Sequence, residues 1–138
     1  MKMMGILTPR EIIKYVEKVI SLTLVNEGTR DVRMVQRAVL ELEAEFYSPE
    51  FAQYKDNYAR VAGLMPEYTG KSYENHVKQL VEVHNKMGLL GHLARTREIH
   101  GPEFDMALCS LGVNLQMLEA SAETMDYNFQ EAGSSRTR

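Results

Sequence analysis

The feature that most constrains this chain is a heptad pattern of apolar residues near its C-terminus. Between residues 104 and 129, apolar side chains recur at alternating steps of four and three. This line, called the seam below, comprises Phe104, Leu108, Leu111, Leu115, Leu118, Ala122, Met125 and Phe129. Such spacing is the a/d pattern of a helix that buries one face, and here it lasts for more than three heptads. The sequence therefore predicts one continuous, buried helix over 104–129.

A second apolar line lies on the opposite side of the same predicted helix. Met106, Val113, Ala120 and Tyr127 recur at every seventh residue, and Met117 adds an unbranched, adaptable side chain beside them. A helix that is apolar on two faces must be covered on both. We expect the seam to pack on the chain's own helices and the second line to pack on a copy of the chain or on another protein.

Composition is that of a folded domain. The chain has 138 residues, of which 44% are hydrophobic and 25% charged. No apolar run approaches the roughly 20 residues that span a bilayer, and the first residues lack the apolar core of a signal peptide. Cys109 is the single cysteine, which is typical of a protein in a reducing compartment. We therefore expect a cytoplasmic protein without a membrane segment.

Helical periodicity and proline positions divide the chain into about five helices. Proline at a first helical position loses no hydrogen bond, so three of the four prolines are predicted helix starts. The fourth, Pro66, lies in a segment, 63–70, that is predicted to be a loop because it has turn residues at both ends. Four helices are expected before the C-terminal one, at about 9–25, 30–47, 49–63 and 72–99. The predicted fold is an all-α, single-domain bundle over 1–132, followed by a flexible tail over 133–138.

Four histidines, spaced by eight residues each, are the obvious candidates for a metal site. They are His76, His84, His92 and His100. Eight residues of helix rise about 12 Å and rotate by about 80°, so no two of them can share an ion on one straight helix. His84 is aligned with apolar residues and is expected to lie in the core or an interface. We predict no metal centre and no cofactor.

Carboxylates give an alternative hypothesis, a Mg²⁺-dependent hydrolase acting on nucleotides. Glu41 and Glu45 form an i,i+4 pair, and Glu123 and Asp126 lie on one face of the C-terminal helix. Two acidic helices facing each other would suit Mg²⁺, which prefers oxygen ligands. The arrangement is similar to the carboxylate pairs of helical nucleoside-triphosphate pyrophosphohydrolases. Only the Glu-x-x-Asp half of that pattern is present, and the Glu-x-x-Glu half is missing.

Arginines give a second alternative, a helix-turn-helix regulator that binds DNA. Arg30, Arg33 and Arg37 would line one face of a helix that follows a short turn after another helix. Asp31 and the acidic residues later in that helix would repel DNA, and this argues against nucleic acid as a partner.

The sequence thus favours a small, non-enzymatic helical protein that acts through protein–protein contacts as a regulator, inhibitor or assembly factor and that self-associates. The residues expected to make those contacts are Met106, Val113, Met117, Ala120 and Tyr127.

Overall fold

Five α-helices make up the computed structural model, which describes residues 6–24, 30–64 and 66–136. Their bounds are α1 Pro9–Leu24, α2 Val32–Phe46, α3 Pro49–Leu64, α4 Pro66–Arg95 and α5 Pro102–Arg136. Within these ranges there is no β-strand. The predicted all-α domain of about five helices is confirmed.

Local sequence signals set the helix starts. Proline is the first residue of every helix but α2, where its missing N–H has no intrahelical partner to lose. In α2 the Asp31 carboxylate accepts the Met34 backbone N–H at 3.2 Å, which satisfies one of the free donors at the helix start. At α3 the Ser48 hydroxyl accepts the Phe51 N–H at 3.3 Å in the same way.

The predicted helix bounds were wrong around α4 and incomplete at α5. Pro66 begins α4 rather than lying in a loop, and α4 ends at Arg95 rather than near residue 99. The turn residues of 63–70 were misleading because a proline followed by a glutamate also makes a good first helical turn. At the other end, α5 continues to Arg136, four residues into the segment expected to be a tail, and residues 137–138 lie outside the described ranges.

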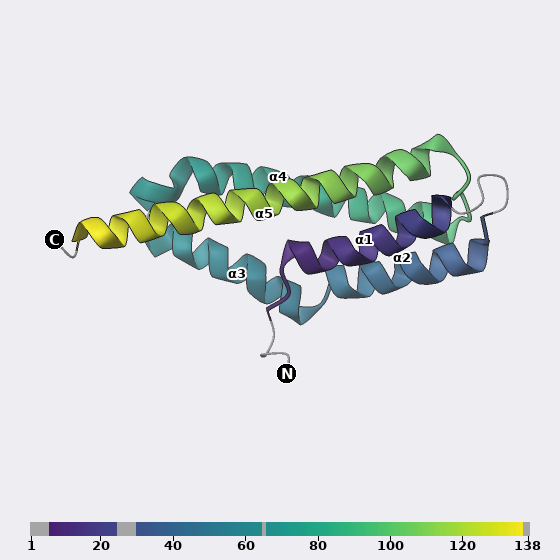
Figure 1. The fold of residues 1–138 in the computed structure, drawn as a ribbon, viewed down its shortest axis with the longest axis horizontal. Coiled ribbons are helices and arrows are strands. Elements are labelled where there is room, and N and C mark those ends of the chain that lie inside the picture. The colour runs from purple at the N-terminus through teal and green to yellow at the C-terminus, as the bar shows by residue number, and fades with distance from the viewer. Residues whose placement is uncertain (1–5, 25–29, 65, 137–138) are drawn as a thin grey trace.

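The long helices α4 and α5 run side by side through the whole molecule, and the shorter helices cover different parts of them (Figure 1). Helices α1 and α2 pack on the C-terminal part of α4 and the N-terminal part of α5, and we call this the four-helix half. Helix α3 packs on the remaining parts of α4 and α5, which we call the three-helix half.

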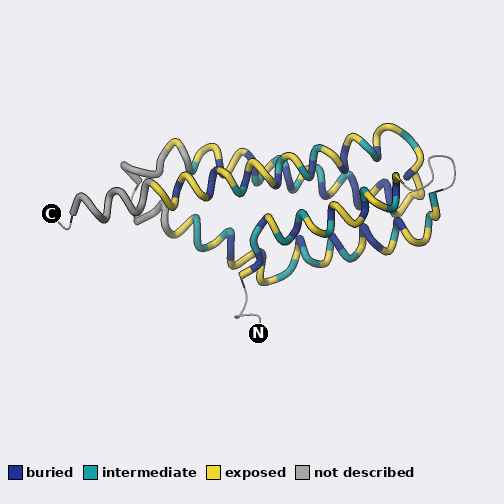
Figure 2. Tube along the Cα trace, viewed as in Figure 1, coloured by how far each residue is buried: buried dark blue, intermediate teal, exposed yellow. Residues whose placement is uncertain are grey.

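The seam of α5 lies in the core along both halves. Figure 2 shows buried segments along the inner sides of the helices. Every seam residue from Phe104 to Met125 is at most 2% exposed, whereas the side chain of Phe129 lies outside the described residues. The prediction that one face of this helix packs on the chain's own helices is confirmed for that stretch.

A glycine on α4 leaves room for a side chain of α2. A Cβ atom on Gly91 would collide with a carboxylate oxygen of Glu43, and that same carboxylate pairs with Arg95 on α4. The glycine therefore serves close approach of a neighbouring side chain rather than a turn.

Candidate interaction face

The outward side of α5 is apolar and exposed. The exposed fractions are 69% for Met106, 53% for Val113, 45% for Met117 and 62% for Tyr127, and Ala120 between them is also exposed. We call these five residues the outer face. The structure thus leaves open the surface that the sequence predicted to need a cover. A line of large apolar side chains on one helix is unlike the singly scattered apolar residues of an ordinary surface.

The outer face is also free of charge over much of its length. No charged residue occurs in the thirteen positions 106–118, between Asp105 and Glu119. The polar residues that flank the apolar ones there include Ser110, Asn114 and Gln116, all neutral. Helix surfaces exposed to water normally carry charged side chains, and depletion of charge is typical of the centre of an interface. The exposed apolar side chains and the absence of charge therefore both mark the outer face as a candidate interface.

A shallow groove of about 350 Å³ adjoins one end of the outer face, between α4 and α5. Its lining is mostly apolar and includes one basic and one acidic side chain. The lining residues are Lys86, Leu89, Pro102, Glu103, Met106, Ala107 and Ser110.

Three acidic side chains in the C-terminal part of α5 are held on its flank, toward α1 and α3. Glu119 accepts the Arg10 backbone N–H at 3.2 Å, a donor in the first turn of α1 that has no intrahelical partner. The Arg10 guanidinium lies 3.8 Å from Glu123, and the Asp126 carboxylate accepts the Tyr58 hydroxyl of α3 at 2.8 Å. These contacts keep the carboxylates beside the outer face rather than on it.

The structure does not bring the four carboxylates of the hydrolase alternative into one site. Glu41 pairs with Lys18 of α1 at 2.9 Å. Glu45 lies near Tyr15, whose pKa is raised by burial and then by this carboxylate. Glu123 and Asp126 have the separate partners given above. Within the described ranges, no three His, Cys, Asp or Glu side chains are arranged to hold a metal ion.

Arg30 does not lie on the helix face proposed for the DNA-binding alternative. It precedes α2, and only 9% of its side chain is exposed. Its guanidinium donates to the backbone carbonyls of Thr23 and Ile99 at 3.2 and 2.5 Å and pairs with Asp105 at 2.9 Å. The placement of Arg30 on that helix face was wrong: its planar guanidinium joins three segments through several donors instead. Arg33 and Arg37 are exposed on α2.

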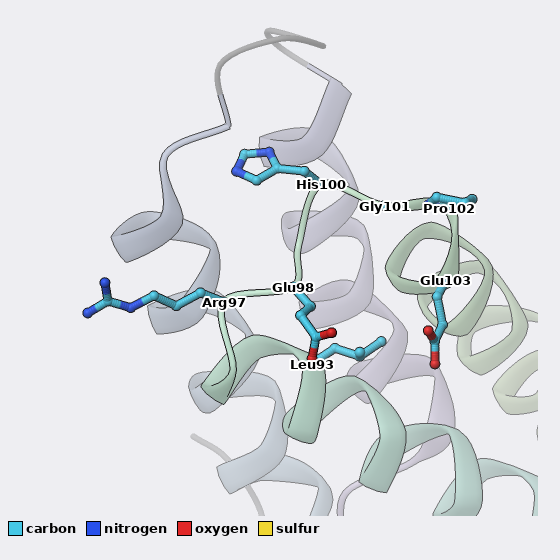
Figure 3. A pocket seen from close by; sticks show the side chains of 7 residues that line it. All are labelled: Leu93, Arg97, Glu98, His100, Gly101, Pro102 and Glu103. Atoms are coloured by element: carbon cyan, nitrogen blue, oxygen red, sulfur yellow. The ribbon is translucent and has the colours of Figure 1, made fainter.

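The turn between α4 and α5 holds a shallow pocket of about 410 Å³ (Figure 3). The Glu98 N–H donates to the Leu93 carbonyl at 2.8 Å and the Arg97 N–H to the Ala94 carbonyl at 3.2 Å. This pattern ends a helix with one residue in the left-handed conformation, and Arg97 has φ of 63°. Figure 3 shows its side chain directed away from the two carboxylates of the pocket, Glu98 and Glu103. The turn is explained by helix termination.

Sequence reasoning missed a layer of buried polar side chains in the three-helix half. His76 is 1% exposed, and its Nδ1 lies 2.9 Å from the Ser121 hydroxyl, which itself donates to the Leu118 carbonyl at 2.8 Å. Because the hydroxyl proton is used there, the neutral imidazole of His76 donates from Nδ1, and its Nε2 carries no hydrogen. Nε2 has no hydrogen-bond partner among the described residues. Burial lowers the pKa of His76 to about 4.

Two tyrosines of α3 complete this layer. Tyr54 is 4% exposed, and its hydroxyl likewise lacks a partner among the described residues. Burial raises the pKa of Tyr54. The Tyr58 ring lies 5.3 Å from the His76 ring, centroid to centroid, and burial and then the hydrogen bond to Asp126 raise the pKa of the Tyr58 hydroxyl. One signal was present in the sequence, since His76 precedes Leu80, Val83 and Met87 at the seam spacing of four and three.

The other three histidines lie at the margin of the core or at the surface. His84 is half-buried, and its Nε2 lies 3.2 Å from the Lys55 ammonium group, so it accepts a hydrogen bond in its neutral form. Burial first, and the Lys55 charge second, lower its pKa. His92 and His100 are exposed.

Comparison with known proteins gives no relative: the chain matches no protein-family model, no curated protein and no solved structure. Among the described residues, none of the helices combines the length and the apolar character required to cross a bilayer.

Proposed function

We propose that this protein is a non-enzymatic, cytoplasmic interaction protein, and that the outer face of α5 is the surface through which it associates with itself. A regulator, an inhibitor or an assembly factor would use a surface of this kind. The observation that carries the proposal is an exposed apolar line, uncharged over most of its length, on the longest helix of the molecule. From Met106 to Tyr127 it is about 32 Å long at 1.5 Å per residue.

The energetics support reversible association. Burying a large apolar side chain completely contributes about 1.5–3 kcal/mol, and the outer-face side chains are roughly half exposed. Four of them on each of two protomers would contribute on the order of 8 kcal/mol in total. Association itself costs an estimated 4 kcal/mol or more. The expected complex is therefore weak and concentration-dependent rather than permanent.

Sedimentation velocity over a wide range of concentrations tests the proposal. We expect the wild-type protein to shift from monomer to a larger species as its concentration rises. Val113→Glu, which places a charge in the centre of the outer face, should remain monomeric, because a buried carboxylate without a partner is strongly unfavourable. Its far-UV circular dichroism should be unchanged.

Val81→Glu is a matched control. Val81 lies on α4 and is 52% exposed, against 53% for Val113, so the same substitution is made at the same exposure on another helix. This variant should associate like the wild type. A wild-type protein that stays monomeric at millimolar concentration, or equal loss of association in both variants, would contradict the proposal.

A further inference from the structure

We infer that the second copy lies antiparallel on the outer face, so that Tyr127 of each copy packs beside Met106 of the other, at the groove between α4 and α5. This inference rests on the proposed function and adds to it the orientation of the pair and the residues that meet. Three features of α5 support it: the spacing of the outer face, the position of its charges and the place of the groove.

The spacing of the outer face has a midpoint between residues 116 and 117. An antiparallel pair centred there places Met106 opposite Tyr127 of the second copy and Val113 opposite Ala120, a larger side chain against a small one. Residues that repeat at every seventh position stay in contact when two helices cross at about 20° with a left-handed twist. The whole line can therefore be buried by one straight partner helix of the same sequence.

The charges favour the antiparallel orientation over the parallel one. From Glu103 to Asp126, every charged residue of α5 is acidic. In a parallel pair, Glu119 and Glu123 would each lie at the same height as the identical residue of the second copy, and like charges repel. In the antiparallel pair, Glu119 lies at the height of Asn114 and Glu123 at the height of Ser110, both neutral. At these two positions the parallel pair brings like charges to the same height on the flanks of the contact, and the antiparallel pair does not.

The groove lies where the antiparallel pair brings Tyr127. Met106 is part of its lining, and Leu89, Pro102 and Ala107 offer an apolar surface for an aromatic ring. Lys86 and Ser110, also in the lining, offer polar groups for a phenol hydroxyl. Tyrosine is enriched among the residues that dominate interface energies because it combines a large apolar ring with a polar tip. Tyr127, at 62% exposure, is the largest side chain available on the outer face.

Disulfide cross-linking distinguishes the two orientations. Met106→Cys and Tyr127→Cys are made as separate proteins, each with Cys109→Ser so that only one thiol remains, and both are oxidised with diamide alone and as an equal mixture. In the antiparallel pair, each variant alone holds its two thiols about 32 Å apart, far beyond the reach of a disulfide. The mixture should give a linked heterodimer, and neither variant alone should give a linked dimer above background.

Two controls keep the outcomes separate. Gln53→Cys with Cys109→Ser, on exposed α3, measures random oxidation. The wild type is a further reporter, because its Cys109 thiols would lie about 22 Å apart in the antiparallel pair and at the same height in the parallel one. Linked dimers of each single variant would overturn the orientation while leaving the outer face as the interface. A concentration-dependent dimer without any link above the Gln53→Cys background would place the contact elsewhere and overturn the inference.

Discussion

The two halves of the molecule share α4 and α5 but differ in what they bury. The four-helix half has an apolar core, and its buried Thr23 hydroxyl donates to the Ile20 carbonyl at 2.8 Å. The three-helix half buries an imidazole, a phenol and an amide, namely His76, Tyr54 and Gln79. Both of the buried side-chain polar atoms without a partner, among the described residues, lie there.

The half covered by a single helix is thus the one in which buried polar groups lack partners. In the four-helix half, α1 packs on α5 and α2 on α4, and their buried side chains are aliphatic apart from Thr23 and Phe46. In the three-helix half, α3 covers both long helices alone and fills the space with large rings, Tyr54 and Tyr58, which are tilted against each other near His76. Planar rings fill volume but bring polar atoms with them, and each unpaired buried polar atom costs about 1–3 kcal/mol. The three-helix half is therefore expected to be the less stable one.

The largest expected effect is the loss of stability on shortening a core side chain in the four-helix half. Leu111→Ala should lower the free energy of unfolding by about 2–5 kcal/mol, because Leu111 is fully buried and its removal leaves a cavity. Met125→Ala, an equally buried site in the three-helix half, should cost less, since a weaker region collapses more readily around a cavity. Urea denaturation followed by circular dichroism measures both. Equal losses would argue that the two halves are equally well packed.

Acid should weaken the three-helix half through His76. Its pKa is about 4 in the folded chain, lower than the ordinary 6.5, so the unfolded chain binds the proton first. Stability should therefore be full above about pH 6.5 and should fall as the pH drops toward 4, by up to about 3 kcal/mol. The pKa of His84 is lowered as well, so its contribution has the same sign.

Variants separate the two histidines. His76→Asn should flatten most of this pH dependence in urea titrations, whereas His84→Gln should leave most of it in place. A wild-type protein equally stable at pH 7 and pH 4.5 would show that the imidazole of His76 is not buried in its neutral form.

The smallest effect is a pair of opposite changes at the two tyrosines. Tyr54→Phe removes a buried hydroxyl without a partner and should raise the melting temperature, with a gain of about 1 kcal/mol. Tyr58→Phe removes the hydrogen bond to Asp126 and should lower the melting temperature, with a loss of about 1 kcal/mol in the free energy of unfolding, because a charged acceptor loses its donor. Calorimetry of both variants provides the comparison, and a loss of stability in Tyr54→Phe would reveal a partner for that hydroxyl.

The sequence predicted the all-α class, the helices at three prolines and the buried seam because each depends on local spacing. The residues around Pro66 did not decide between a loop and a helix start, because they are compatible with both. The position of Arg30 was predicted wrongly, and the burial of His76 was missed, for another reason. The partners of Arg30, at Ile99 and Asp105, and the partner of His76, at Ser121, are distant in the sequence. Such contacts follow from the tertiary arrangement, which spacing along one helix does not reveal.

Because α4 and α5 continue without a break from one half into the other, the boundary between the halves is not a place where the chain can divide. Opening of the weaker half would start at its outer end and advance along both long helices until α1 and α2 hold them. In the antiparallel pair, α5 of the less stable three-helix half of each copy would lie against α5 of the more stable four-helix half of the other. Association would then suppress this local opening, and amide hydrogens near the C-terminal part of α5 would exchange more slowly as the protein concentration rises.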